Sequence, residues 1–195
     1  MLPLIGVLGT GLWLYVLHVM QKAKLPAWRF FWGGAGLFIL MMVFIRPVLT
    51  QPLAQGVSAL AGFFGRATGT FTPYFKYGTI FVETPTGAMT LQIDMECSGI
   101  LEIMAFMALL VFFDVYSFQE KILVSLLGIF YILVANAMRI ILICEIIHMG
   151  GSGYYHMAHT YIGRIFFYVL SVLLYFYVFT KPQIVKMRVG TFKYD

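Results

Sequence analysis

Five long apolar stretches constrain what this chain can fold into more than any other feature of its sequence. They cover roughly residues 2–20, 30–49, 98–114, 121–147 and 160–180. A helix that crosses a bilayer needs about 20 mainly apolar residues. Charged residues make up only 11% of the chain, against about 25% in soluble domains, so too little polar surface remains to coat a water-soluble body. The sequence predicts an all-α polytopic membrane protein with about five transmembrane helices, in a single membrane domain over residues 1–195.

Basic residues between and after these stretches predict the orientation of the chain. They are Lys22, Lys24 and Arg29 in the first connection, Lys121 beside the third, and Lys181, Lys186, Arg188 and Lys193 in the tail. Because Lys and Arg in short loops stay on the cytoplasmic side, we expect the N-terminus outside the cell (plasma) membrane and the basic tail, 181–195, in the cytoplasm. The same distribution suits contacts with anionic lipids of the bilayer. The net charge of +5 therefore does not indicate nucleic-acid binding.

The N-terminal half divides into two expected parts. Residues 1–49 should form two spans, and residues 50–76 should follow as an interfacial or re-entrant segment, with a further span as the alternative. This second part is apolar but is interrupted by Gly56, Gly62, Gly65, Arg66 and Gly69.

Residues 77–96 differ from the rest and predict a small β-hairpin. Apolar and polar residues alternate strictly from Met89 to Glu96, which is the pattern of a half-buried strand. Gly78–Glu83 is the expected partner strand, and the Thr84–Gly87 segment between them has turn chemistry. An open strand edge would leave backbone groups unpaired in lipid. The hairpin should therefore be extracytoplasmic and lead directly into Cys97.

Three polar residues are expected to converge at one membrane face. Cys97 opens the third major span, Arg139 lies near the outer end of the fourth, and His159 begins the fifth. Because successive spans run in opposite directions, all three fall on the extracytoplasmic side. From Lys121 to Arg139 a helix rises about 27 Å, most of a hydrocarbon core of about 30 Å. Residues 97–180 would then form a catalytic three-helix core.

These three residue types suit nucleophilic catalysis. A thiolate is the nucleophile, and helix N-termini and nearby cations lower the pKa of a thiol, so we expect a low pKa for Cys97. His159 can act as a general base and then protonate a leaving amine. Arg139 can hold a carboxylate or stabilise an oxyanion. Supporting roles are expected for Asn136, which shares a helix face with Arg139, and for two others, Ser98 and Glu102.

Each of these residues also has a structural interpretation, and two other functions remain open. Cys144 is expected to be inert, Arg139 could reach lipid phosphate, and Glu102 suits a helix N-terminus or could pair with Arg139. A non-enzymatic transporter subunit or assembly partner would need none of the three as catalysts. A metal-dependent membrane hydrolase could assemble a site from Glu145, His148, His156 and His159, but no H-E-x-x-H motif is present. We expect no metal and no cofactor.

Around these residues the sequence resembles the exosortase/archaeosortase family of membrane transpeptidase-like enzymes. The matching segments are Glu96-Cys97-Ser98-Gly99-Ile100, Asn136-Ala137-Met138-Arg139-Ile140 and His159-Thr160-Tyr161-Ile162-Gly163. Their order and spacing agree with the family pattern of C-S-G, N-x-x-R and H-x-x-x-G, over about residues 80–163. The chain looks closest to the compact subfamily found in Gram-positive bacteria.

The resemblance implies a cysteine peptidase or transpeptidase that uses Cys97, Arg139 and His159. It also implies a membrane-anchored protein substrate that carries a C-terminal sorting signal, and an acceptor nucleophile whose identity is unknown.

Overall fold

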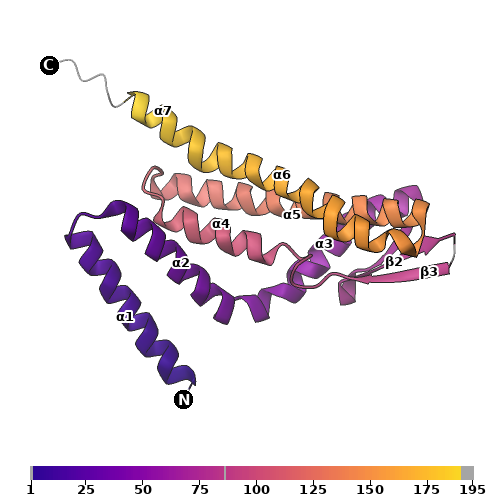
Figure 1. Ribbon diagram of the computed structural model, residues 1–195, viewed down its shortest axis with the longest axis horizontal. Coiled ribbons are helices and arrows are strands. Elements are labelled where there is room, and N and C mark those ends of the chain that lie inside the picture. The colour runs from indigo at the N-terminus through magenta and orange to yellow at the C-terminus, as the bar shows by residue number, and fades with distance from the viewer. Residues whose placement is uncertain (1, 86, 190–195) are drawn as a thin grey trace.

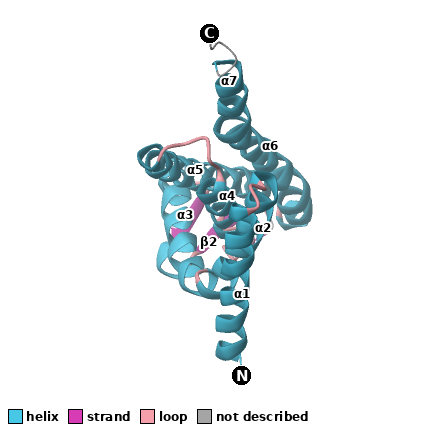
Figure 2. Cartoon of the chain, turned by 90° about the vertical axis from the view of Figure 1, so that its left-hand side faces the viewer, coloured by secondary structure: helices cyan, strands magenta, loops and turns pink. Residues whose placement is uncertain are grey.

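The computed structural model describes residues 2–85 and 87–189. Its helices are α1 (Leu2–Lys22), α2 (Pro26–Phe44), α3 (Arg46–Thr68), α4 (Ile100–Phe112), α5 (Phe118–Gly150), α6 (Gly163–Tyr175) and α7 (Lys181–Val189). Its strands are β1 (Phe71–Tyr74), β2 (Thr79–Thr84) and β3 (Gly87–Gln92). Helices α4, α5 and α6 pack side by side, and the sheet lies at the end remote from the α4–α5 turn (Figure 1). The two terminal helices project in opposite directions (Figure 2).

Within the described residues, three helical segments are long and apolar enough to cross a membrane. They are Pro26–Phe44, Phe118–Gly150 and Ser152–Val185, and they coincide with the stretches expected at 30–49, 121–147 and 160–180.

The stretch expected at 98–114 corresponds to α4, which has only 13 residues and rises about 20 Å. This is less than a hydrocarbon core of about 30 Å. The stretch at 2–20 forms α1 but adds no fourth candidate within the described residues. The mostly helical membrane fold is confirmed, whereas the expected count of about five spans is not.

Residues 50–76 form most of a continuous helix, α3, and then β1. The helix buries one face, which consists of Ala54, Val57, Ser58, Ala61, Gly62 and Gly65. These positions recur at the three- and four-residue spacing of a helix face. Phe71 packs against Gly65, and Pro73 packs against Gly62. The glycines that interrupt the apolar pattern thus let β1 approach the helix closely.

A hairpin of β2 and β3 forms where the sequence predicts one, closed by pairing of Thr84 with Gly87. The sheet also contains β1, which the sequence did not predict, in the order β1-β2-β3. The second strand ends at Gln92 instead of continuing to Glu96. Side chains still alternate between exposed and less exposed as far as Glu96. The alternating sequence pattern therefore continues beyond the last residue of the strand.

Helices α3, α4 and α6 all pack against the long helix α5. It begins with a capping box in which the Ser117 hydroxyl accepts from the Glu120 amide and the Glu120 carboxylate accepts from the Ser117 amide. Its 33 residues rise about 50 Å. Phe106 of α4 packs directly on Gly128 of α5, and the ring of Phe106 also meets Phe179 edge to face. This contact brings α4 and the C-terminal helix together beside α5.

The last helical segment contains a wide π-helical turn at Met157–Ile162, immediately before α6. The turn includes His159. Single π-turns inside helices frequently occur at functional sites, and this one sets the position of the imidazole ring.

Candidate active site

Cys97 lies in a tight turn between β3 and α4, and the carboxylate of Asp94 organises this turn. Asp94 Oδ1 accepts hydrogen bonds from the amides of Glu96 (3.0 Å) and Cys97 (3.2 Å). The Ser98 hydroxyl donates to the carbonyl of Met95 at 3.2 Å. Gly99 follows with φ of +76°, a left-handed conformation that favours glycine. The Ser and the Gly of the C-S-G sequence are thus explained by the geometry of the turn.

Asn136 fixes the turn to α5. Its Nδ2 donates to the carbonyl oxygen of Cys97 at 2.5 Å, and its side chain is fully buried. The sequence predicts a supporting role for Asn136, and in the structure its side-chain amide holds the backbone of Cys97.

Cys97 and His159 are in direct contact. Cys97 Sγ lies 3.0 Å from His159 Nε2, so the imidazole can accept the thiol proton once Nε2 is the unprotonated nitrogen. The ring of Tyr155 stacks on that of His159 with centroids 5.4 Å apart and an interplanar angle of 22°. The stack limits rotation of the imidazole and keeps Nε2 directed at the sulfur.

Burial raises the pKa of the Cys97 thiol to about 11, while the positive charge of Arg139 lowers this pKa less than burial raises it. The negative charge of Asp94 and its hydrogen bond raise the pKa further. The low pKa expected from the sequence is therefore wrong for the resting protein, because the turn places the sulfur among buried residues beside a carboxylate. His159 Nε2 is the nearby group placed to accept the thiol proton.

Arg139 lies next to the turn and is 4% exposed. Its Nη1 donates to the carbonyl of Glu96 at 3.3 Å, and its guanidinium lies 5.8 Å from the centroid of the Phe167 ring. Its Nε is buried with no hydrogen-bond partner among the described residues. A buried guanidinium with an unused donor is suited to bind a substrate oxygen.

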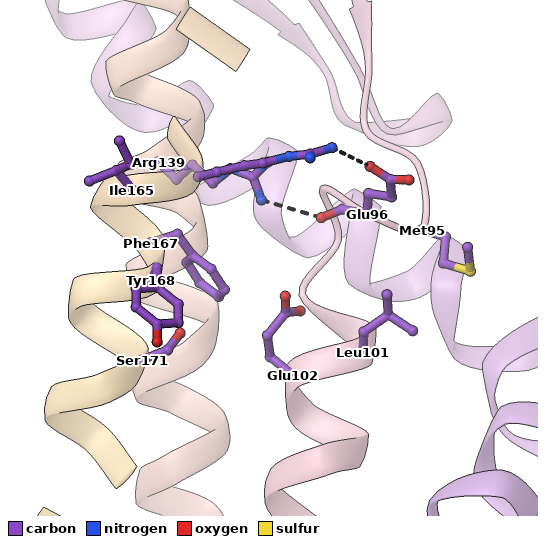
Figure 3. A pocket seen from close by; sticks show the side chains of 10 residues that line it. Met95, Glu96, Leu101, Glu102, Arg139, Ile165, Phe167, Tyr168 and Ser171 are labelled. Atoms are coloured by element: carbon purple, nitrogen blue, oxygen red, sulfur yellow. Dashed lines mark hydrogen bonds and ion pairs between the residues drawn. The ribbon is translucent and has the colours of Figure 1, made fainter. Parts of the chain in front are cut away.

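A cavity of about 700 Å³ opens beside Arg139, between α4 and α6. Its lining is Met95, Glu96, Leu101, Glu102, Arg139, Arg164, Ile165, Phe167, Tyr168 and Ser171. Figure 3 shows Glu102 on the side of α4 that faces Phe167, Tyr168 and Ser171, with Arg139 and Glu96 at one end of the cavity. Arg164 pairs with Glu96 at 3.2 Å, and both side chains are exposed. Glu102 points toward the space, and its Oε2 has no partner among the described residues.

Comparison with known proteins identifies the family. A family model described as transmembrane exosortase matches residues 2–176. The chain belongs to the transmembrane exosortase family. The resemblance seen in the sequence is thereby confirmed, and the protein is a member of a family of membrane enzymes that are peptidases or transpeptidases in general. No curated protein and no solved structure matches the chain.

The exosortase fold separates the residues of the alternative metal site. Glu145 accepts a hydrogen bond from the hydroxyl of Thr70 at 2.6 Å, and His148 Nδ1 lies 2.6 Å from the carbonyl of Glu83. His156 contacts the ring of Tyr161, whereas His159 faces Cys97. Over residues 2–85 and 87–189, no three His, Cys, Asp or Glu side chains are grouped as metal ligands.

Two residues important to the exosortase site were not singled out in the sequence. Asp94 was assigned to the polar face of a strand, although an Asp three positions before Cys97 is also the signal of a side-chain-capped turn. Tyr155 has no local signal, because its stacking on His159 depends on the path of the chain into the π-helical turn.

Proposed function

We propose that this protein is a membrane-embedded cysteine peptidase or transpeptidase in which Cys97 is the nucleophile. The observation that carries the proposal is the 3.0 Å contact between Cys97 Sγ and His159 Nε2. A nucleophile and base within hydrogen-bond reach, with the base oriented by a third group, is the arrangement that covalent catalysis requires. Tyr155 provides that orientation here.

The reaction begins when His159 Nε2 takes the thiol proton as Cys97 Sγ attacks the scissile carbonyl carbon. The resulting oxyanion is stabilised by Arg139, whose Nε is available. The C–N bond then breaks, and the leaving amine takes the proton from His159, which leaves a thioester on Cys97. An acceptor O–H or N–H group attacks this thioester, and its proton passes through His159 back to the sulfur as the S–C bond breaks. Water as the acceptor gives hydrolysis, and another nucleophile gives transfer.

The substrate in this proposal is a membrane-anchored protein with a C-terminal sorting signal, cleaved at the extracytoplasmic face. The cavity beside Arg139 is lined mostly by apolar side chains of α4 and α6, which suits an apolar segment arriving from the bilayer. The N-terminus lies outside the plasma membrane and the basic C-terminal tail lies in the cytoplasm, so that Cys97 faces the extracytoplasmic side.

The test compares the two cysteines, which are both free and buried. Cells that produce the Cys97→Ala variant should accumulate an uncleaved membrane-anchored precursor, which is detected by comparing membrane proteins from variant and wild-type cells by mass spectrometry. Cells that produce Cys144→Ala should process the same precursor normally, because Cys144 is a buried residue of the apolar core, whereas the contact with His159 Nε2 is made by Cys97. Equal processing by Cys97→Ala and wild type, with both proteins inserted in the membrane, contradicts the proposal.

A further inference from the structure

The two edges of the three-stranded sheet differ in how they are protected from pairing with another chain. Natural proteins protect exposed strand edges with proline, charge, bulges or a covering helix, because an open edge pairs with other chains. The β1 edge is protected twice. It carries Pro73, which has no backbone N–H, and α3 packs against β1 at Gly62 and Gly65.

The β3 edge lacks these protections. Its residues Gly87–Gln92 include no proline and no charged side chain. In the strand order β1-β2-β3 it pairs only with β2, and it lies at the margin of the molecule (Figure 1). Within the described residues, a six-residue strand therefore presents an open row of backbone donors and acceptors.

The register shows which backbone groups are available. The amide of Ile93 donates to the carbonyl of Gly78 at 2.8 Å, which marks that pair as hydrogen-bonded. Such pairs alternate along an antiparallel ladder, so the backbone amides and carbonyls of Leu91 and Met89 also point toward β2. The amides and carbonyls of Ala88, Thr90 and Gln92 consequently point away from the sheet, and their side chains are exposed.

This open edge leads to the nucleophile. The end of β3, at Leu91 and Gln92, lines the same small cavity, about 20 Å³, as Cys97 and His159. Ile80 of β2 lies directly opposite Leu91, lines the same cavity and is fully buried, so it anchors this face of the sheet. A chain that paired with β3 would therefore be held by a rigid support and delivered beside the Cys97–His159 pair.

We propose that the substrate segment next to the scissile bond binds as an added fourth strand along β3. This inference rests on the proposed function, and it specifies how the peptide is recognised. An extended chain gains affinity from main-chain hydrogen bonds when it joins a sheet edge, and only alternate side chains meet the protein. Recognition beside the scissile bond is thus largely independent of side-chain identity, and it requires an extended segment whose paired positions are not proline.

The test removes one outward donor without altering the inner ladder. Thr90→Pro deletes an N–H that faces away from β2, and proline is tolerated at such edge positions. Thr90→Val is the matched control, because it keeps the N–H and the side-chain shape. The probe is the precursor that accumulates with Cys97→Ala. Thr90→Pro should process it at least tenfold more slowly than Thr90→Val, mainly through a raised KM, with the same thermal unfolding midpoint.

Equal processing by a folded Thr90→Pro variant and Thr90→Val overturns the inference. If Thr90→Pro does not fold, amide hydrogen exchange tests the inference instead. It is measured on the purified Cys97→Ala variant with and without bound precursor. The amides of Ala88, Thr90 and Gln92 should exchange at least tenfold more slowly than without precursor, while the amide of Phe71 on β1 should not change.

Two exchange results contradict strand addition. One is unchanged exchange at β3 while the precursor stays bound. The other is protection without precursor that grows with protein concentration, which assigns the edge to a second copy of the chain. A complete absence of precursor in Cys97→Ala cells instead contradicts the proposed function, so the two failures are distinguishable.

Discussion

The side-chain amide of Asn136 donates to the backbone carbonyl of Cys97 across 39 positions of sequence. This bond ties Cys97 to the long helix α5, and it does so through the backbone carbonyl of Cys97 and not through its sulfur. The geometry of the Cys97–His159 pair therefore depends on a residue that takes no part in bond making.

Asn136→Ala should lower both stability and activity. The change leaves the Cys97 carbonyl buried without its partner, which costs about 1–3 kcal/mol, and it releases the turn that aims the sulfur. We expect at least tenfold slower precursor processing and a lower unfolding midpoint. Ser125→Ala is the control, because the Ser125 hydroxyl donates to the Lys121 carbonyl of its own helix. Equal effects of the two changes would argue against a specific role for Asn136.

The raised pKa of Cys97 predicts how its alkylation depends on pH. With a pKa of about 11, the thiolate fraction rises roughly tenfold per pH unit between pH 7 and 10. Alkylation by iodoacetamide, after subtraction of the rate in Cys97→Ala, should rise in the same way. A rate that is flat from pH 6 to 9 would indicate a thiolate already formed in the resting protein.

Asp94→Asn should accelerate the alkylation of Cys97 at any given pH. The negative charge of Asp94 raises the pKa of the thiol, so its removal lowers that pKa and increases the thiolate fraction. The asparagine oxygen can still accept from the amides of Glu96 and Cys97, which preserves the turn. Mass spectrometry of the alkylated peptide measures the rate, and a slower reaction than in wild type would contradict the assigned sign.

Arg139→Lys should lose most of the activity although it retains a positive charge. Lysine lacks the planar group with several donors, so it cannot bond the Glu96 carbonyl and also stabilise an oxyanion. We expect processing slower by about 10²–10³-fold, the usual cost of one oxyanion donor. Arg29→Lys is the matched control, because the Arg29 guanidinium forms a 3.9 Å pair with the exposed carboxylate of Asp114. Comparable activity of the two variants would remove Arg139 from the proposed mechanism.

Gly128→Ala should destabilise the protein even though alanine favours helices. The added methyl group meets the ring of Phe106, and overpacking of this kind costs about 1–3 kcal/mol. Gly56→Ala is the opposite case, because open space surrounds that position on α3 and the change should stabilise by about 0.5–1 kcal/mol. Thermal unfolding in detergent measures both, and shifts of the same sign would contradict the packing assigned to Phe106.

Much of the fold follows from the sequence because apolar periodicity and turn chemistry are local. The long helices and the β2–β3 hairpin were predictable in this way. The approach of Cys97 to His159 followed from the alternating direction of the spans. By contrast, α3 and β1 depend on each other, because the positions of the α3 glycines are explained only by the packing of Phe71 and Pro73 against them. A pattern along one segment does not reveal such a pairing.

The finer parts of the site depend on short-range backbone geometry that the periodic patterns do not encode. Asp94 occupies a polar position in an alternating sequence and was assigned to a strand, but its carboxylate ends the strand by capping the turn. The pKa of Cys97 was misjudged for the same reason, because burial in that turn outweighs the nearby guanidinium.

The π-helical turn at Met157–Ile162 has a consequence for where the length of this helix can change. Such a turn accommodates one residue more than an α-helix would, so removing a single residue there would restore regular winding while the flanking helical turns kept their phase. Removing a residue from the regular part of α6 would instead rotate everything beyond it by about 100°. A loss of one residue within the turn would therefore leave the cavity-lining face of α6 in place and would displace mainly His159 itself.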